Sequence, residues 1–357
     1  NSGKIKLLTP GNGEIENASA APIETDGPVR AELLYTGRYA AGLTYELRVS
    51  FFAGQSFVRL EHTVTSVSDD PYLRLRSLAL SLPGAFETGA VGIDGVERTL
   101  ATLEPPHTLF QAEADVAILD DGPPRRRADG WARAVGDGVA VTLVAPFFWQ
   151  EYPKAFLLEA DRLTLDLFAG TRTPVELGSG AAKTHEVWIA IEPASAADHP
   201  GTLARRLALP LVAVPPAAWT VASRALPQAL APDTPAARDF LARLGAAYAR
   251  YRDHVATERW DDGPIDACDA QVPPHPRVGL YGVLNWGDWQ FPGFHSRTHG
   301  CEAWGNLEYD LPQVLGLGYF ATGSRDFLDG LVPAVRHYRD VHIIHHAPGT
   351  PDWVGMN

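Results

Sequence analysis

Cysteine and methionine are scarce in this sequence, which has two cysteines and one methionine among 357 residues. Cys268 and Cys301 lack the paired spacing of a zinc finger, so we expect neither a structural zinc site nor a disulfide scaffold, although a single bridge stays open. The methionine is Met356, so the chain does not begin at a translation start. We therefore expect a fragment or a processed piece.

Long hydrophobic runs and an excess of positive charge are also missing. No apolar run reaches the roughly 18 residues of a membrane helix, and the N-terminus lacks the basic and apolar regions of a signal peptide. A membrane is therefore excluded as a partner. Lys and Arg number 30 against 43 Asp and Glu, a net charge of −13 that would repel a phosphate backbone. Nucleic acid is excluded as well, whereas local binding of an anionic sugar is not.

Several enzyme motifs are absent. The sequence has no GxSxG nucleophile turn, no Walker loop and no dinucleotide fingerprint between a strand and a helix. These absences leave carbohydrate chemistry as the simplest use of the tryptophans, acids, tyrosine and histidines in the dense polar and aromatic region between Asn285 and His346.

The first half of the chain has a hydrophobic period of two. The segment 43–51 alternates apolar and polar residues and the segment 58–64 repeats the alternation after Gly54, which predicts an antiparallel hairpin with one buried face. Further strands are expected at 74–82, 139–144 and 162–168, and another at 185–191. Many strands joined by short turns favour an antiparallel β-sandwich.

The composition then changes to alanine and proline, which is typical of a connection between domains. Thr234 before Pro235 predicts a helix start, and helices are expected at about 306–321, ended by Gly323, and after Ser324. We predict a β-sandwich domain over 1–210, a Pro/Ala-rich linker over 211–234 and the start of an α/α toroid over 235–357. The toroid is incomplete, because a stretch of this length is too short for six helical hairpins.

Two aromatic motifs lie near the start of the helical region. Asn285–Trp289 (NWGDW) places two indoles and Asp288 around a glycine, an arrangement suited to stacking a sugar ring and binding its hydroxyls. Trp304–Asp310 (WGNLEYD) adds Asn306, Glu308 and Tyr309. Each motif taken alone is equally well explained by a structural loop or by acids that compensate a helix dipole.

A third cluster holds four of the twelve histidines within ten residues. His337 and Asp340 are separated by three residues on a predicted helix, close enough for the carboxylate to orient the imidazole as a base. Metal binding through His342, His345 and His346 is the alternative, although no HExxH-type spacing accompanies them. A third interpretation is that these histidines have a structural role only, with their hydrogen bonds satisfied at the end of a helix.

In the β region, Pro153 should break a strand within FFWQEYPK and leave Trp149, Tyr152 and Lys154 on an irregular segment. Such a segment could reach a sugar cleft, where Lys154 would meet a uronate carboxylate. A plain strand ending is the alternative.

Taken in order, five motifs resemble the exo-acting rhamnogalacturonan lyases of polysaccharide lyase family 26 and their bacterial relatives. They are FFWQEYPK (147–154), AAKTHE (181–186), NWGDW (285–289), WGNLEYD (304–310) and RHYRDVHIIH (336–345). The resemblance covers about residues 25–350 and implies β-rich domains before an α/α toroid, with the remainder of the toroid supplied from outside this chain. His342 departs from the family pattern, where an acidic residue is expected.

The function that follows is β-elimination on a uronate-containing pectic polysaccharide of the rhamnogalacturonan type, by a secreted or periplasmic lyase. A base removes the C5 proton, a cationic or amide group neutralises the carboxylate, and an acid protonates the leaving oxygen. The predicted catalytic residues are His337 as base, Tyr309 as acid or alternative base, Asn306 and Asp340.

The predicted substrate-binding residues are Trp149, Tyr152, Lys154, Asp288, Trp289, Glu308 and His345. No metal ligands are assigned and the cofactor stays unknown, with a divalent cation left open. The alternatives are a hydrolase that uses Asp288 and Glu308 as paired carboxylates, and a non-catalytic carbohydrate-binding fragment.

Overall fold

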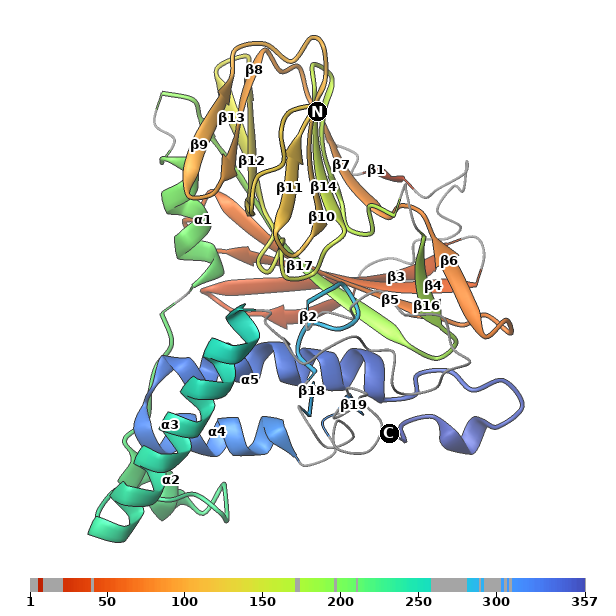
Figure 1. Ribbon diagram of the computed structural model, residues 1–357. Helices are drawn as coiled ribbons and strands as arrows, with labels where there is room; N and C mark the ends of the chain where they lie inside the picture. The colour runs from red at the N-terminus through yellow and green to blue at the C-terminus, as the bar shows by residue number, and fades with distance from the viewer. Residues whose placement is uncertain are drawn as a thin grey trace. The chain divides into compact units, whose positions relative to one another are not determined.

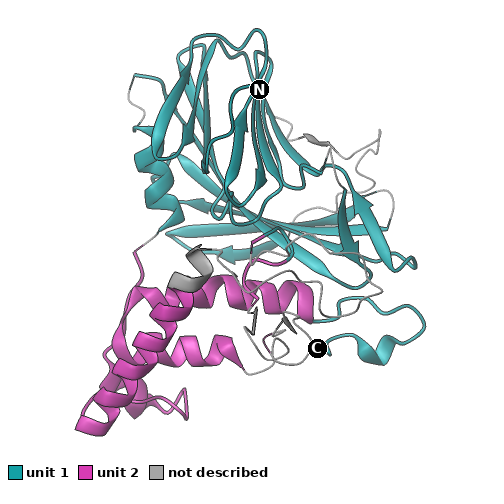
Figure 2. Cartoon of the chain, viewed as in Figure 1, with its two compact units in different colours: residues 1–210, 282–284, 343–357 teal, residues 211–281, 285–342 magenta. Residues whose placement is uncertain are grey.

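The computed structural model (Figure 1) describes residues 6–8, 22–39, 42–170, 174–195, 198–209, 211–257, 281–288, 290–291, 303–304, 307 and 310–356. The chain separates into two compact units, which Figure 2 distinguishes by colour. The first, called here the β unit, comprises residues 1–210, 282–284 and 343–357; the second, the helical unit, comprises 211–281 and 285–342. Residues 211–234, the predicted linker, are thus grouped with the helical unit, and the last fifteen residues with the β unit.

The β unit consists mostly of antiparallel strands. They are β1 (Lys6–Leu8), β2 (Ile23–Asp26), β3 (Arg30–Tyr39), β4 (Leu43–Phe52), β5 (Phe57–Ser66), β6 (Tyr72–Leu75), β7 (Ala79–Pro83), β8 (Thr88–Ile93), β9 (Val96–Leu100), β10 (His107–Glu113), β11 (Val116–Leu119), β12 (Ala128–Gly136), β13 (Val139–Val144), β14 (Lys154–Glu159), β15 (Arg162–Asp166), β16 (Val175–Gly178) and β17 (Ala182–Pro193). A nine-stranded sheet has the order β2-β3-β4-β5-β17-β13-β12-β8-β9, and a six-stranded sheet has the order β1-β7-β15-β14-β10-β11.

The predicted hairpin is confirmed as β4 and β5, which pair antiparallel. The apolar set of β4 is buried from Leu43 to Val49, as alternation on a one-sided strand requires. Phe51 departs from the predicted alternation, because it is 43% exposed while Ser50 is buried. At this end of the hairpin the neighbouring Phe52 packs against the cluster on which helix α1 (Pro200–Ala208) lies, so burial has changed face.

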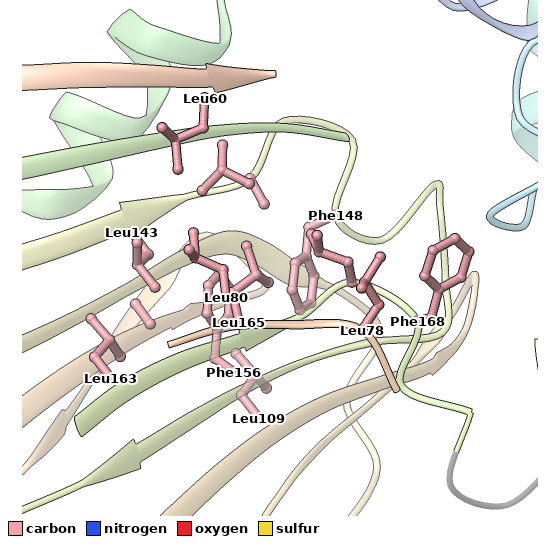
Figure 3. Packing of buried hydrophobic residues seen from close by; sticks show 14 of the residues in the cluster. Leu60, Leu78, Leu80, Leu109, Leu143, Phe148, Phe156, Leu163, Leu165 and Phe168 are labelled. Atoms are coloured by element: carbon pink, nitrogen blue, oxygen red, sulfur yellow. The ribbon is translucent and has the colours of Figure 1, made fainter. Parts of the chain in front are cut away.

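The two large sheets share one hydrophobic core, and this makes the β unit a sandwich. Leu60 and Leu143 come from the nine-stranded sheet, and Phe156, Leu163 and Leu165 come from the six-stranded sheet; all belong to the same buried cluster (Figure 3). Removing one such side chain, as in Phe156→Ala, typically costs about 3–5 kcal/mol. The sandwich therefore supplies a rigid framework for the residues that follow each strand.

The strand predicted over 74–82 is wrong as a single element. Its first part is β6, which pairs with β16 in a separate two-stranded sheet, and its second part is β7, which pairs with β15 and β1. Arg76, Ser77 and Leu78 lie between them. The apolar positions change phase here, from Leu73 and Leu75 to Leu78, Leu80 and Leu82, and the prediction of one strand overlooked this break.

The helical unit contains α2 (Ala217–Ser223), α3 (Pro235–Thr257), α4 (Leu311–Thr322) and α5 (Arg325–His337), with the short pair β18 (Gln290–Phe291) and β19 (Ala303–Trp304). The predicted helix starts at Pro235 and after Ser324 are confirmed, and Thr234 Oγ1 accepts a hydrogen bond from the Ala237 amide at 3.1 Å. Gly323 ends α4 in the left-handed conformation, as its position predicts.

The helix predicted from residue 306 begins later, at Leu311. Leu307 and Asp310 have φ angles of 52° and 51°, a left-handed backbone that a right-handed helix cannot contain. The core of the helical unit joins α3 to α4 and α5, with Tyr248 stacked on Phe327 at a ring distance of 5.5 Å. No helix in the described part of the chain is both long and apolar enough to span a membrane. Cys268 and Cys301 lie outside the described residues.

We predict that the β unit loses stability as the pH falls below about 6.5, the ordinary pKa of histidine. Burial lowers the pKa of His62 to about 4, and burial together with the charge of Lys154 lowers the pKa of His185 to about 3. Both imidazoles stay neutral in the folded protein while the unfolded chain takes up protons. Each histidine thus contributes a loss of about 1.4 kcal/mol per pH unit below that value.

Urea unfolding of the full chain between pH 7.5 and pH 4.5 checks this slope. His62→Gln removes one of the two titrating groups and should flatten the dependence. Equal slopes for the wild-type chain and His62→Gln would contradict the assignment.

Candidate functional site

Asp288, His337 and His342 form a cluster inside the helical unit, called here the histidine–aspartate cluster. The Nε2 atoms of His337 and His342 lie 2.8 Å apart, and Asp288 Oδ2 lies 3.9 Å from His337 Nε2. Asp288 and His337 are 8% and 6% exposed, and His342 is half-buried. One donor atom from each side chain lies within 4.8 Å of the other two, so these residues could hold a metal ion.

A turn of π-helix brings the two histidines together. The α-helix α5 ends at His337 and continues as a π-helical turn from Tyr338 to His342. In an α-helix, residues five apart point about 140° away from each other, since each residue turns by about 100°. The wider π turn, with hydrogen bonds from i to i+5, places positions 337 and 342 on the same side of the helix.

The NWGDW motif is held against α5 by Gly287. This glycine has a φ of 110°, and a Cβ at its position would lie 2.2 Å from the Pro333 carbonyl oxygen and 2.8 Å from His337 Cβ. Only a residue without a side chain permits this approach. The Asp288 amide donates to the Asn285 carbonyl at 3.1 Å, and Trp286 stacks on Tyr281 at 5.2 Å. The loop therefore delivers the Asp288 carboxylate to His337.

The electrostatics of the cluster favour the neutral form of His342. Burial lowers the pKa of His342, and the negative charge of Asp288 offsets part of that shift. A hydrogen bond between the two Nε2 atoms needs one imidazole to donate and the other to accept, so one of these nitrogens is unprotonated. The cluster thus presents at least one nitrogen lone pair beside a carboxylate.

Asp340, the acid predicted to orient His337, is 1% exposed and accepts a hydrogen bond from Arg339 Nε at 2.9 Å. The orienting role of Asp340 stays a prediction, and a further carboxylate, that of Asp288, lies 3.9 Å from His337 Nε2. The prediction assumed an α-helix and considered only neighbours on it. In the sequence, the glycine inside NWGDW was the one feature that indicated a close approach between this loop and another part of the backbone.

Other predicted residues fall elsewhere. Asn306, Tyr309, Trp289 and Glu308 lie outside the described residues, and their roles stay predictions. His345 belongs to the β unit, where its amide donates to the Gly180 carbonyl at 2.8 Å. The proposed metal set of His342, His345 and His346 is therefore divided between the two units, and the histidine that accompanies His342 is His337.

Lys154 lies in a buried group of charges within the β unit. Its Nζ is 2.6 Å from Glu151 Oε2 and 3.3 Å from His185 Nδ1, and Lys183 Nζ is 2.8 Å from Glu151 Oε1. Burial alone would raise the pKa of Glu151, but the charges of the two lysines outweigh it and hold that pKa well below its usual range. Lys154 is only 1% exposed. Its place in the sequence did not indicate that it would be so deeply buried.

Trp149 and Tyr152 are half-buried on the segment that precedes β14. The Arg127 guanidinium lies over the Trp149 ring at 3.6 Å, a cation–π contact, and both residues line a pocket of about 700 Å³ in the β unit. The carbonyl of Tyr152 accepts a hydrogen bond from the Val283 amide at 2.8 Å. Arg127 therefore covers one face of the Trp149 indole, which was predicted to bind substrate.

No protein-family model matches the chain, and no curated protein matches it. Among solved structures, an α-galactosidase from Lactobacillus brevis matches with 13% identity and a TM-score of 0.35, over 54% of this chain and 26% of that one. A heparan sulfate lyase from Pedobacter heparinus matches with 9% identity and a TM-score of 0.31, over 54% and 24%. A putative aldose 1-epimerase from Escherichia coli K12 gives 12% and 0.28, over 49% and 69%. The matched part of this chain corresponds to about a quarter of the galactosidase and of the lyase, and these similarities assign no function to it.

Gly287→Ala should destabilise the helical unit and separate the NWGDW loop from α5. The added methyl group meets the Pro333 carbonyl and requires a backbone angle that alanine avoids, which together cost about 2–4 kcal/mol. Chemical denaturation of the full chain, followed by circular dichroism, measures the loss. Gly245→Ala in α3 is the matched control, because its Cβ meets open space and a helical alanine gains about 0.5–1 kcal/mol. Equal stability of the two variants would be evidence against the close contact.

Lys154→Ala should lower the stability of the β unit by about 3–5 kcal/mol, since it removes one partner of a buried ion pair. Arg74→Ala, which breaks an exposed ion pair with Glu176, should leave the unfolding midpoint nearly unchanged. Thermal unfolding of both variants distinguishes the cases, and a Lys154→Ala chain as stable as Arg74→Ala would contradict a buried pair.

Proposed function

We propose that this chain is part of a polysaccharide lyase that cleaves uronate-containing pectic polysaccharide of the rhamnogalacturonan type by β-elimination. One observation carries the proposal. Two motifs of the ordered set, NWGDW and RHYRDVHIIH, come together in the helical unit, with Gly287 against Pro333 and the Asp288 carboxylate 3.9 Å from His337. The residues that carry the resemblance therefore also form a buried polar cluster.

The chemistry of elimination matches what such a cluster offers. The C5 proton of a uronate is removed only when the neighbouring carboxylate is neutralised, because the carbanion that forms delocalises its charge into that group. The cluster supplies an imidazole nitrogen without a proton, which is what a base at neutral pH requires. That lone pair faces a second imidazole at 2.8 Å, so His337 can accept a substrate proton only when this contact opens. Proton removal is thus assigned to His337 or to Tyr309, the other base predicted from sequence.

The rest of the proposal follows the same resemblance. Helices α3, α4 and α5 would begin an α/α toroid whose remainder comes from outside this chain, and the substrate is an acidic polysaccharide or oligosaccharide. We propose a secreted or periplasmic location. The hydrolase alternative pairs Asp288 with Glu308, which lies outside the described residues; Asp288 is nearly buried and adjoins an imidazole, which suits it poorly to protonating a glycosidic oxygen.

The test is the product formed from rhamnogalacturonan by the chain together with the remainder of its toroid. β-Elimination leaves a conjugated double bond that absorbs ultraviolet light, whereas hydrolysis leaves saturated ends. His337→Ala should lower the initial rate about 100-fold or more, the usual contribution of a general base or of a charge-neutralising group. Arg74→Ala, which breaks an exposed ion pair of the β unit, should keep the wild-type rate. Saturated products would exclude elimination.

A further inference from the structure

We propose that Asp288, His337 and His342 bind one divalent transition-metal cation. The binding itself rests only on the geometry of the cluster. What the cation does there rests on the proposed function, in which it would neutralise the carboxylate of the bound uronate. No metal ligand was assigned from sequence, and the alternative set considered there is divided between the two units.

The distances within the cluster suit a common ligand sphere. Metal–nitrogen bonds to imidazole measure about 2.0–2.1 Å, so two such nitrogens lie about 2.9 Å apart in adjacent octahedral positions and about 3.4 Å apart in a tetrahedron. The observed separation of the two Nε2 atoms is 2.8 Å. A tetrahedral arrangement requires the two Nε2 atoms to move apart by about 0.6 Å and the Asp288 oxygen, now 3.9 Å from His337 Nε2, to approach by about 0.5 Å, within a cluster whose donor atoms all lie within 4.8 Å of one another. Small side-chain rotations therefore suffice.

The three donor atoms of the cluster converge, so one cation could bind all of them at once. The backbone also brings the ligands together in advance: the π turn aligns His337 with His342, and the contact of Gly287 with Pro333 fixes the loop that carries Asp288. π-Helical turns of this kind are frequent at functional sites.

The donor set selects the class of metal. Two imidazole nitrogens and one carboxylate oxygen suit zinc and neighbouring transition metals, whereas calcium and magnesium prefer oxygen ligands alone. Three protein ligands leave at least one position open, as in catalytic zinc sites. In the proposed lyase, a uronate carboxylate oxygen would occupy that position, and the cation would neutralise the negative charge of the carboxylate. His337 would then serve as a ligand, and removal of the C5 proton would fall to Tyr309.

The test is zinc binding by the full chain, produced without a histidine tag and stripped of metal with a chelator. Calorimetric titration with Zn²⁺ should show one site per chain with a dissociation constant below about 1 μM. Asp288→Asn and His342→Ala should each weaken binding more than about 100-fold, since even residues that only support a metal ligand cost 10–100-fold. His199→Ala removes an exposed histidine and should bind as the wild-type chain does. Ca²⁺ should not bind at these concentrations.

A second measurement keeps the test decisive if the variants fail to fold. Co²⁺ added to the wild-type chain should give visible absorption bands of a nitrogen- and oxygen-ligated site, and one equivalent of Zn²⁺ should abolish them. Absence of stoichiometric Zn²⁺ binding to the wild-type chain, or undiminished binding in both folded variants, overturns the proposal.

Measurements of zinc binding and of product formation on the same protein distinguish failure of the metal site from failure of the proposed function. Unsaturated product formed at full rate by metal-free protein would remove the cation from the reaction while leaving the lyase in place. Stoichiometric Zn²⁺ binding without elimination on any uronate polymer would retain the site and exclude the lyase.

Discussion

The spacing of five residues between His337 and His342 is the constraint on which the candidate site depends. An α-helix would direct the two rings apart, and only the widened π turn after α5 allows their Nε2 atoms to meet. Pro333, four residues before His337, contributes the carbonyl against which Gly287 packs. The helix end, the glycine loop and the buried carboxylate of Asp288 are thus parts of one arrangement, and changing any of them separates the donor atoms.

In the β unit, the main electrostatic feature is a group of buried charges. Glu151 lies between two buried lysines, and its ionised form is retained because their positive charges outweigh the cost of removing a carboxylate from water. His185 stays neutral beside them, since a further positive charge would be unfavourable in the same volume. The motifs FFWQEYPK and AAKTHE, which contribute to the family resemblance, supply these residues. Their shared occurrence is therefore explained by the stability of the sandwich as well as by any contact with substrate.

Much of the fold follows from local patterns. The alternation in β4 and β5, the threonine before Pro235 and the glycine after α4 each predicted an element that the structure contains, because hydrogen bonding and burial at these places depend on near neighbours. The predictions failed where a segment left its sheet, as between β6 and β7, or where the backbone turned left-handed, as at Leu307 and Asp310. The first event left only a change of phase in the alternation, at Arg76 and Ser77, and the second left no mark in the pattern of polarity.

The sequence by itself determined that strands precede helices, and that histidines, acids and tryptophans, His337 among them, lie close together in the segment 285–346. Tertiary structure alone decided that the carboxylate beside the His337 ring nitrogen is that of Asp288, and that Lys154 is buried against Glu151. The physical reason is distance along the chain. Asp288 and His337 are separated by 48 intervening residues, and their contact depends on how a loop and a helix pack, which no local spacing specifies.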